Sequence, residues 1–229
     1  MSKKIILINY IVLGIFFVLN ILASVYLITN SKTEIIFNNN ILKTVEIKVT
    51  DNQITWGYAT GCFVDSNGTI LTNKHVVYNS ITEANYDLIQ VRLANVDEWV
   101  DAEVLKVSEN DDLALIKIDK QNTQYFNLQL NLNNGETIYT IGNPNGFGLS
   151  FVSGVVSSNL RNIIYNDQTI PSIQTSFVIN EGNSGGPVFN SSGELVGLIS
   201  FRLKDNNGDV IQGVSFAVPA SIINNFLAD

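Results

Sequence analysis

The segment Glu181–Pro187, with the sequence EGNSGGP, says more about the fold and chemistry of this 229-residue chain than any other stretch. It sets one serine, Ser184, between glycines. Because Gly182 has no side chain, its backbone N–H stays uncovered and can join the N–H of Ser184 in donating to an oxygen that gains negative charge. Gly185 and Gly186 permit a tight turn and a close approach of substrate to the backbone. The segment predicts a loop that presents a serine nucleophile, and a flexible glycine loop without chemistry is the alternative.

The only histidine of the chain, His75, follows the apolar run Ile70–Thr72. A lone histidine is more often a structural or surface residue than a base. If Ser184 is a nucleophile that needs an imidazole to accept its proton, however, His75 is the only candidate. The two residues together predict nucleophilic catalysis with His75 as the base.

Such a pair needs a carboxylate that orients the imidazole and stabilises its protonated form. Asp112 directly precedes the apolar, alternating run Leu113–Ile118, which predicts a half-buried strand. Asp111 is the competing candidate, but adjacent residues at the start of a strand point in different directions, so only one can face His75. We favour Asp112, and Asp111 is then a solvated turn residue.

The order His75, Asp112, Ser184 is that of the chymotrypsin-type barrels. Further matching segments occur in order: 60–64 (TGCFV), 67–77 (NGTILTNKHVV), 112–115 (DLAL), 141–146 (IGNPNG), 152–157 (VSGVVS), 173–175 (IQT), 193–197 (GELVG) and 216–219 (FAVP). On these motifs the chain resembles the trypsin-like serine proteases of the bacterial HtrA/Deg type over about residues 42–227. It departs from that pattern at Ser176, where aspartate is common, and at Glu181, where proline or a basic residue is. The resemblance implies an all-β fold of two six-stranded antiparallel barrels with the active site between them.

The residues beyond position 41 agree with that fold, since short runs rich in β-branched and aromatic residues are separated by turn signals. Val45–Val49 alternates with period two, and Asn67–Gly68 predicts a hairpin turn. Ala220–Leu227 predicts a short C-terminal helix. We expect a protease domain over 42–229, with barrels at about 42–125 and 133–219. Because about ten residues follow Pro219, we expect no PDZ domain.

Residues 5–28 form a 24-residue apolar segment, which is long enough to cross a bilayer as a helix. Lys3 and Lys4 precede it, so the positive-inside rule places residues 1–4 in the cytoplasm and the protease domain outside. The alternative is a cleaved signal peptide and a secreted protein. A signal peptide has an apolar core of about 7–15 residues, and no clear Ala-x-Ala cleavage site follows, so we favour an uncleaved anchor with a tether over 29–41.

Composition excludes several classes of function. The 13 basic and 21 acidic residues give a formal net charge of −8, with no basic stripe for a nucleic acid. The single cysteine, Cys62, has no internal disulfide partner and is expected to be a small buried apolar residue. One histidine and one cysteine do not make a zinc site, and we expect neither a metal nor a cofactor.

The resemblance implies a serine endopeptidase that acts on protein or peptide substrates, and the apolar segment 5–28 adds that it is membrane-anchored and extracytoplasmic. Ser184 is then the nucleophile, His75 the base and Asp112 its orienting acid, while Gly182 and Ser184 supply the oxyanion donors. A catalytically silent, protease-like binding or sensing module of the cell envelope is the alternative function. The sequence predicts no oligomeric state.

The resemblance also implies a primary specificity pocket with Val178 at its floor and Ile179 beside it. The strand Leu198–Arg202 corresponds to the pocket wall, with Ser200, Phe201 and Arg202 in contact with substrate. Neither floor residue can pair with a cation, and an unpaired buried cation is costly. We therefore expect a small or medium aliphatic residue before the cleaved bond rather than arginine or lysine.

Overall fold

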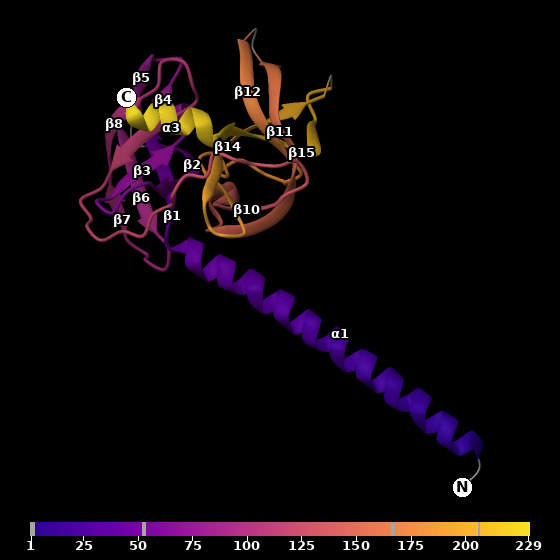
Figure 1. Cartoon of the computed structure of the whole chain (residues 1–229). Coiled ribbons are helices and arrows are strands. Elements are labelled where there is room, and N and C mark those ends of the chain that lie inside the picture. Colours follow the sequence, from indigo (N-terminus) through magenta and orange to yellow (C-terminus); the bar gives the residue numbers. More distant parts are fainter. Residues whose placement is uncertain (1–2, 52–53, 166–167, 206) are drawn as a thin grey trace. The chain divides into compact units, whose positions relative to one another are not determined.

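The computed structural model describes residues 3–51, 54–165, 168–205 and 207–229 (Figure 1). The chain divides into two units, Met1–Asn38 and Asn39–Asp229. The first consists of most of the helix α1 (Lys3–Ile41). Its portion Ile8–Ile41 has a mean hydropathy of 2.6 in an 18-residue window, and is long and apolar enough to cross a membrane by length and composition. Residues 29–41, expected to form a tether, belong to the same helix, and no glycine or proline interrupts them.

The first half of the second unit is one antiparallel sheet in the order β7-β6-β1-β2-β3-β9-β8. Its strands are β1 (Thr44–Asp51), β2 (Ile54–Phe63), β3 (Thr69–Thr72), β6 (Leu88–Leu93), β7 (Trp99–Asp101), β8 (Glu103–Val107) and β9 (Ala114–Lys117). Val45, Ile47 and Val49 of β1 alternate into its core, as the period-two pattern predicts. A small two-stranded sheet, β4 (Tyr78–Asn79) with β5 (Ala84–Asn85), follows the short helix α2 (Lys74–Val77).

This first sheet has seven strands and is not the six-stranded barrel expected from the sequence. The cause lies at Ala102, the single residue between β7 and β8. Its N–H donates to the carbonyl of Ile89 at 2.8 Å, so the pairing with β6 continues to this residue. One extended stretch is thereby divided into two strands, which pair with opposite members of the sheet, β6 and β9.

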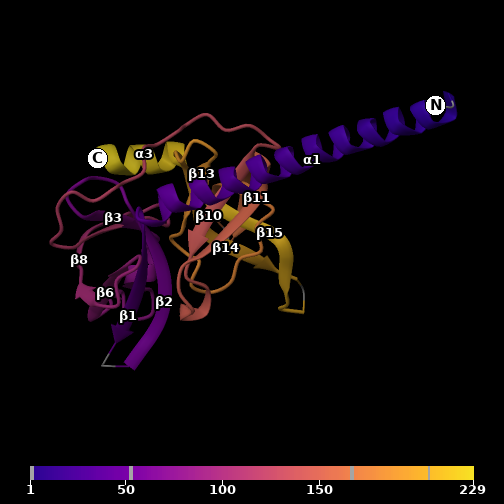
Figure 2. The same ribbon diagram turned by 90° about the horizontal axis from the view of Figure 1, so that it is seen from below.

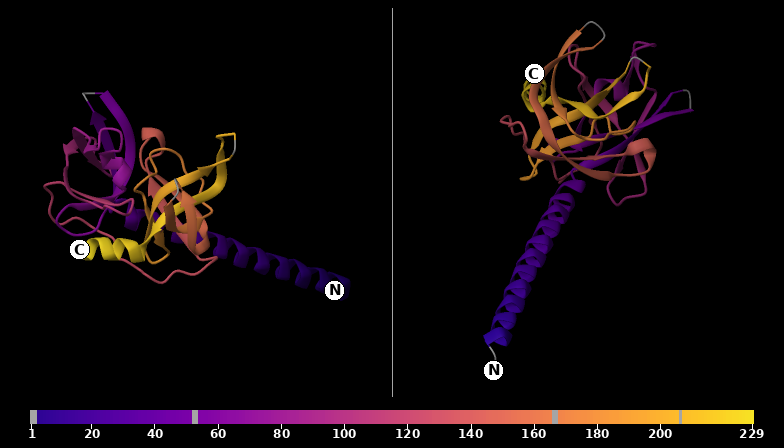
Figure 3. Two further views of the ribbon diagram at one scale, coloured as in Figure 1. Left: turned by 90° about the horizontal axis from the view of Figure 1, so that it is seen from above. Right: turned by 90° about the vertical axis from the view of Figure 1, so that its right-hand side faces the viewer.

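The second half is a closed barrel of six antiparallel strands in the order β10-β11-β12-β15-β14-β13. Its strands are β10 (Thr137–Gly142), β11 (Ser150–Tyr165), β12 (Gln168–Thr175), β13 (Pro187–Asn190), β14 (Leu195–Lys204) and β15 (Val210–Pro219). Its core contains Ile138, Val156, Ile173 and Ile199. The hairpin of β11 and β12, in orange, projects beyond the rest of the barrel (Figure 3). A turn of 3-10 helix, η1 (Pro144–Gly146), follows β10.

The expected C-terminal helix is present as α3 (Ala220–Ala228). Ala220, Ile223 and Phe226 form its buried face, at the three-residue spacing of an amphipathic helix. The helix starts where β15 ends, and Lys106 of β8 donates to the carbonyl of Phe226 at 2.7 Å. The last element of the chain therefore spans from the barrel to the first sheet (Figures 1 and 2).

Candidate active site

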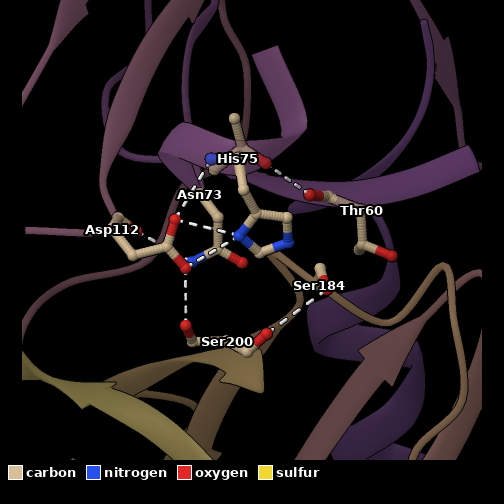
Figure 4. A network of polar contacts seen from close by, with 7 residues as sticks. Thr60, Asn73, His75, Asp112, Ser184 and Ser200 are labelled. Carbon is tan, nitrogen blue, oxygen red and sulfur yellow. Dashed lines mark hydrogen bonds and ion pairs between the residues drawn. The ribbon is translucent and has the colours of Figure 1, made fainter. Parts of the chain in front are cut away.

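The sheet and the barrel each contribute part of one polar cluster (Figure 4). His75 is the second residue of α2, and Asp112 lies two residues before β9, so both belong to the first sheet. Ser184 lies in the loop between β12 and β13 of the barrel. In the view of Figure 4 the imidazole lies between Asp112 and Ser184. The fold thus brings together three residues that are 37 and 72 positions apart in the sequence.

Asp112 is the acid that faces His75. The Nδ1 atom of His75 lies 2.9 Å from each carboxylate oxygen of Asp112, and the backbone N–H of His75 donates to Oδ1 at 3.1 Å. Asp111, the alternative, lines the same cavity as His75 and Asp112, and burial raises the pKa of its carboxyl. Both acids lie in the bend before β9, and in the described part of the chain it is the Asp112 carboxylate that contacts the imidazole.

Two further residues hold Asp112 in place. The Ser200 hydroxyl of β14 donates to Oδ2 at 2.5 Å, which ties the barrel to the carboxylate. The Asn73 amide donates to the Asp112 carbonyl at 2.9 Å, and Asn73 is fully buried at the start of α2. The carboxylate and its backbone are therefore both fixed.

The pKa values of the two groups move in opposite directions. Burial by itself lowers the pKa of His75, but the hydrogen bond and the charge of Asp112 outweigh it, so this pKa lies above its ordinary 6.5. Burial by itself raises the pKa of Asp112, but the hydrogen bond and charge of His75, with the Ser200 hydroxyl, bring it below 3.8. An ionised Asp112 beside a strengthened base is the arrangement that general-base catalysis requires.

The Ser184 hydroxyl is half-buried and donates to the Ser200 carbonyl at 3.4 Å. Among the described residues the Ser184 hydroxyl makes this hydrogen bond and makes none to His75. A rotation about the Cα–Cβ bond of Ser184 changes the direction of the hydroxyl without any movement of the backbone.

Hydrogen bonds to its carbonyl groups hold the backbone around Ser184 in place. Each carbonyl of residues 181–184 accepts one hydrogen bond: Glu181 from Asn145 N (2.7 Å), Gly182 from Thr60 Oγ1 (2.7 Å), Asn183 from Gly186 N (2.9 Å) and Ser184 from Thr60 N (2.9 Å). In a trans peptide the N–H points away from the carbonyl of the preceding residue. The N–H groups of Gly182 and Ser184 therefore point away from the groups that hold the loop, and neither donates to another protein group in the described part of the chain.

Only glycine fits at position 182. Its φ of +94° lies in the left-handed region, and a Cβ atom there would lie 2.0 Å from the Asn143 carbonyl oxygen. The loop therefore lies directly against the turn that follows β10. This contact gives a structural reason for the glycine that the sequence places before Asn183.

The two residues expected at the floor of the primary pocket lie on opposite faces of one extended segment. Along the extended segment before the loop, Thr175, Phe177 and Ile179 are buried and alternate with outward residues. The Val178 side chain points outward and is 55% exposed, whereas that of Ile179 packs in the barrel core. Val178 is therefore not the base of an enclosed pocket.

Arg202 on the expected pocket wall contacts the opposite segment. Its Nη1 donates to the Ile179 carbonyl at 3.0 Å and to the Asn180 side chain at 3.3 Å, while Nη2 lies 3.9 Å from the Glu181 carboxylate. Phe201 beside it stacks on Phe216, with ring centroids 5.0 Å apart. The guanidinium thus joins β14 to the chain that leads into Gly182.

A cavity of about 880 Å³ opens beside the His75–Asp112 pair. Residues of both halves line it, among them Tyr78, Asp111, Ile170, Ser200 and Phe201. It has room for several side chains of an extended peptide. His75 and Asp112 are among its lining residues, and Ser184 is not.

Thr60 and Asn73 belong to the site but were not identified from the sequence. Each lies inside a motif that carried the resemblance, at 60–64 and 67–77. That both are polar, in otherwise apolar strand ends, is the signal that could have pointed to them. Their partners lie far away in the sequence, however, and no spacing rule reveals them.

Comparison with known proteins identifies the family of the chain. The family described as Trypsin-like peptidase domain matches residues 59–198. Over 164 residues, 71% of this chain, the chain is 39% identical to proteins named "Probable periplasmic serine endoprotease DegP-like" from Pseudomonas putida and Hahella chejuensis. It spans about a third of the length of these curated relatives, 32% and 33%.

Solved structures give the same result. The HtrA-type protease AlgW with tripeptide has a TM-score of 0.73 and 26% identity, over 84% of this chain and 61% of that one. The serine endoprotease from Yersinia pestis has a TM-score of 0.69 and 27% identity, over 84% and 64%. Because the family match extends from Ala59 to Leu198, more than half of the chain, this protein belongs to the trypsin-like peptidase domain family and has HtrA- and DegP-type proteases among its relatives.

Proposed function

We propose that this protein is a serine endopeptidase that hydrolyses peptide bonds in protein or peptide substrates. One observation carries the proposal. The His75–Asp112 pair of the first half lies beside the Ser184 loop of the barrel, in which each carbonyl of residues 181–184 accepts a hydrogen bond. This geometry supports a reaction in which one base, His75, and two backbone donors, those of Gly182 and Ser184, act on the reaction of the Ser184 hydroxyl. This is the set of groups that acyl transfer by a serine needs.

In the proposed reaction, the Ser184 hydroxyl turns from the Ser200 carbonyl to His75 Nε2 and attacks the carbonyl carbon of the substrate. Nε2 accepts the hydroxyl proton, while Asp112 keeps the Nδ1 proton in place and stabilises the imidazolium. The N–H groups of Gly182 and Ser184 stabilise the oxyanion. His75 then gives its proton to the departing amine, and a water molecule, activated in the same way, releases the acyl group from Ser184.

For substrate binding we propose the cavity beside His75 together with the segments on either side of Ser184. Ser200 and Phe201 present the β14 strand to an extended peptide. Arg202 and the exposed Val178 border the residue before the cleaved bond, and Ile179, whose side chain packs in the barrel core, holds Arg202 through its carbonyl. Because the Arg202 guanidinium lies 3.0 Å from the Ile179 carbonyl, a lysine or arginine side chain would meet a like charge there. A small or medium aliphatic residue is the proposed preference.

We further propose that α1 anchors the protein in a membrane, with the N-terminus in the cytoplasm and the protease domain outside. The supporting observations are the apolar stretch Ile8–Ile41, the lysines at 3 and 4, and the periplasmic names of the curated relatives. The protein should then fractionate with membranes, resist extraction by high salt and be degraded by protease added from outside. A soluble form beginning near residue 25–30 would contradict the anchor and support a cleaved signal peptide.

The test of the activity is labelling of the purified full chain in detergent with a fluorophosphonate, together with hydrolysis of casein. Wild type should label at one site and cleave casein, and Ser184→Ala should do neither. The alternative, a silent binding module, is favoured by the Ser184 hydrogen bond to the Ser200 carbonyl instead of to His75. A folded wild type that neither labels nor cleaves would establish that alternative and overturn the proposal.

A further inference from the structure

Thr60 is the point at which the first sheet holds the loop of Ser184. It is fully buried near the end of β2, and its hydroxyl, N–H and carbonyl all make hydrogen bonds. The hydroxyl accepts from the Asn143 N–H at 2.9 Å and donates to the Gly182 carbonyl at 2.7 Å. The Thr60 N–H donates to the Ser184 carbonyl at 2.9 Å, and the Thr60 carbonyl accepts from the Thr72 hydroxyl at 2.8 Å. One residue thus contacts both ends of the segment that carries the two free N–H groups.

The hydroxyl of Thr60 has a defined direction. Because it accepts from the Asn143 N–H, which has no acceptor capacity, its own proton is free to point to the Gly182 carbonyl. Of the four hydrogen bonds to the carbonyls of residues 181–184, this is the only one donated by a side chain. It is therefore the only one that a substitution can remove while every backbone donor stays in place.

The bond from Thr60 restrains Gly182, the most flexible residue of the segment 181–184. Gly182 has no side chain to restrict it, and the peptides on its two sides can rotate. Asn145 N holds the peptide before it through the Glu181 carbonyl, and Thr60 Oγ1 holds the peptide after it. The two bonds together fix φ and ψ of Gly182, and hence the direction of its N–H relative to that of Ser184.

We propose that Thr60 is a positioning residue for the reaction: its side-chain hydroxyl keeps the N–H groups of Gly182 and Ser184 aimed at the oxyanion. This rests on the proposed peptidase activity. Thr60 does not touch the substrate, and its effect passes through Gly182. Loss of the hydroxyl should therefore lower kcat, where the oxyanion forms, much more than it raises KM.

The variant Thr60→Val removes the hydroxyl and preserves the shape of the side chain, while Thr60→Ser keeps the hydroxyl. Thr123→Val is the matched control, because the buried Thr123 hydroxyl also donates to a carbonyl at 2.7 Å, that of Asp65, away from the Ser184 loop. With a fluorogenic peptide substrate and the full chain in detergent, Thr60→Val should lose about 10–100-fold in kcat, below the loss for deleting an oxyanion donor outright. KM should change by less than about threefold. Thr60→Ser and Thr123→Val should keep kcat within about threefold of wild type.

Hydrogen exchange measured by mass spectrometry supplies a readout independent of activity. The N–H groups of Asn183, Gly185 and Gly186 donate to Asn180, Ile199 and Asn183 carbonyls, so their protection reports the order of the loop. Protection should fall in Thr60→Val and be retained in Thr60→Ser and Thr123→Val. If Thr60→Val does not fold, Thr60→Ala, which leaves room for water in place of the hydroxyl, is measured by the same readouts.

Three outcomes separate the possibilities. A Thr60→Val protein with wild-type kcat and wild-type protection would overturn the role of Thr60. Equal losses in Thr60→Val and Thr123→Val, in step with their melting temperatures, would reduce it to general stability and also overturn it. If wild type itself neither labels nor cleaves, the proposed activity fails, and loss of loop protection confined to Thr60→Val still supports the positioning of Gly182 by Thr60, whereas unchanged protection overturns it.

Discussion

Asp112 binds His75 twice, through the imidazole Nδ1 at 2.9 Å and through the backbone N–H at 3.1 Å. The carboxylate therefore fixes the ring relative to the helix that carries it. Rotation of the imidazole would break the first bond while the second still held Asp112 in place. The base is thus oriented before any substrate binds, which lowers the cost of reaching the reactive geometry.

The first prediction concerns the two adjacent acids. Asp112→Asn should lower kcat by about 10⁴-fold, because the amide cannot hold the tautomer of His75 that leaves Nε2 free. Asp111→Asn should change kcat by less than about threefold, since the imidazole contacts in the described residues go to Asp112. Steady-state kinetics on the two variants decides between them. The reverse ranking would make Asp111 the orienting acid.

The pH dependence of the rate follows from the raised pKa of His75. The reaction needs the neutral imidazole, so kcat/KM should fall as pH drops through a value above the ordinary 6.5. A profile of kcat/KM against pH in wild type measures the His75 midpoint, and a midpoint clearly below 6.5 would contradict the prediction.

Ser200→Ala removes a hydrogen bond from Asp112 and should raise the pKa of that acid.

Stability should depend on pH through the same pair. The lowered pKa of Asp112 stabilises the folded state at pH above 3.8, and this contribution is lost as pH falls through the lower, folded value. The raised pKa of His75 stabilises it below 6.5, and this is lost as pH rises through the higher, folded value. Melting temperatures of wild type and His75→Ala across pH 5–9 should therefore converge at the alkaline end.

Two glycines with similar φ angles, Gly182 and Gly135, should respond differently to substitution by alanine. Gly182→Ala would place Cβ 2.0 Å from the Asn143 carbonyl oxygen, so the loop must move and kcat should fall by about 100-fold or more. Gly135→Ala meets nothing within 4 Å at a φ of +80°, so it should cost only the left-handed strain, about 1–2 kcal/mol. Kinetics and thermal melts of both variants provide the comparison. Equal effects on kcat would show that the Asn143 contact is unimportant.

Arg202 should influence both the loop and the choice of substrate. Arg202→Ala removes the donors to Ile179 and Asn180 and should lower kcat/KM by about 3–10-fold, in the range of one or two hydrogen bonds. It should also weaken the discrimination against lysine and arginine before the cleaved bond. A peptide-library profile measures both effects, with the exposed Arg161→Ala as control. A wild type that strongly prefers arginine or lysine at that position would refute the assignment.

The sequence identified the candidate base, acid and nucleophile for a clear reason. Each lies in a short motif whose local chemistry is distinctive, and with a single histidine no second base competes. The C-terminal helix followed from its apolar spacing. These features depend on neighbours within a few positions, which is the range that sequence patterns describe.

Other features depend on contacts that no local pattern encodes. The bond from Thr60 to Gly182 joins residues 122 positions apart. The phase that turns Val178 outward is set by the packing of Phe177 and Ile179 in the barrel core. Likewise the break at Ala102 between β7 and β8 depends on their different partner strands, β6 and β9.

The division of the site between sheet and barrel has a mechanical consequence. His75 and Asp112 move with the sheet and Ser184 with the barrel, so a slide of one half past the other changes the separation of base and nucleophile by the same amount. Within each half, strand hydrogen bonds keep the geometry. Resistance to such a slide therefore depends on the contacts that join the two halves, among them the hydroxyl and N–H of Thr60, the Ser200 hydroxyl, and helix α3 with its bond to Lys106.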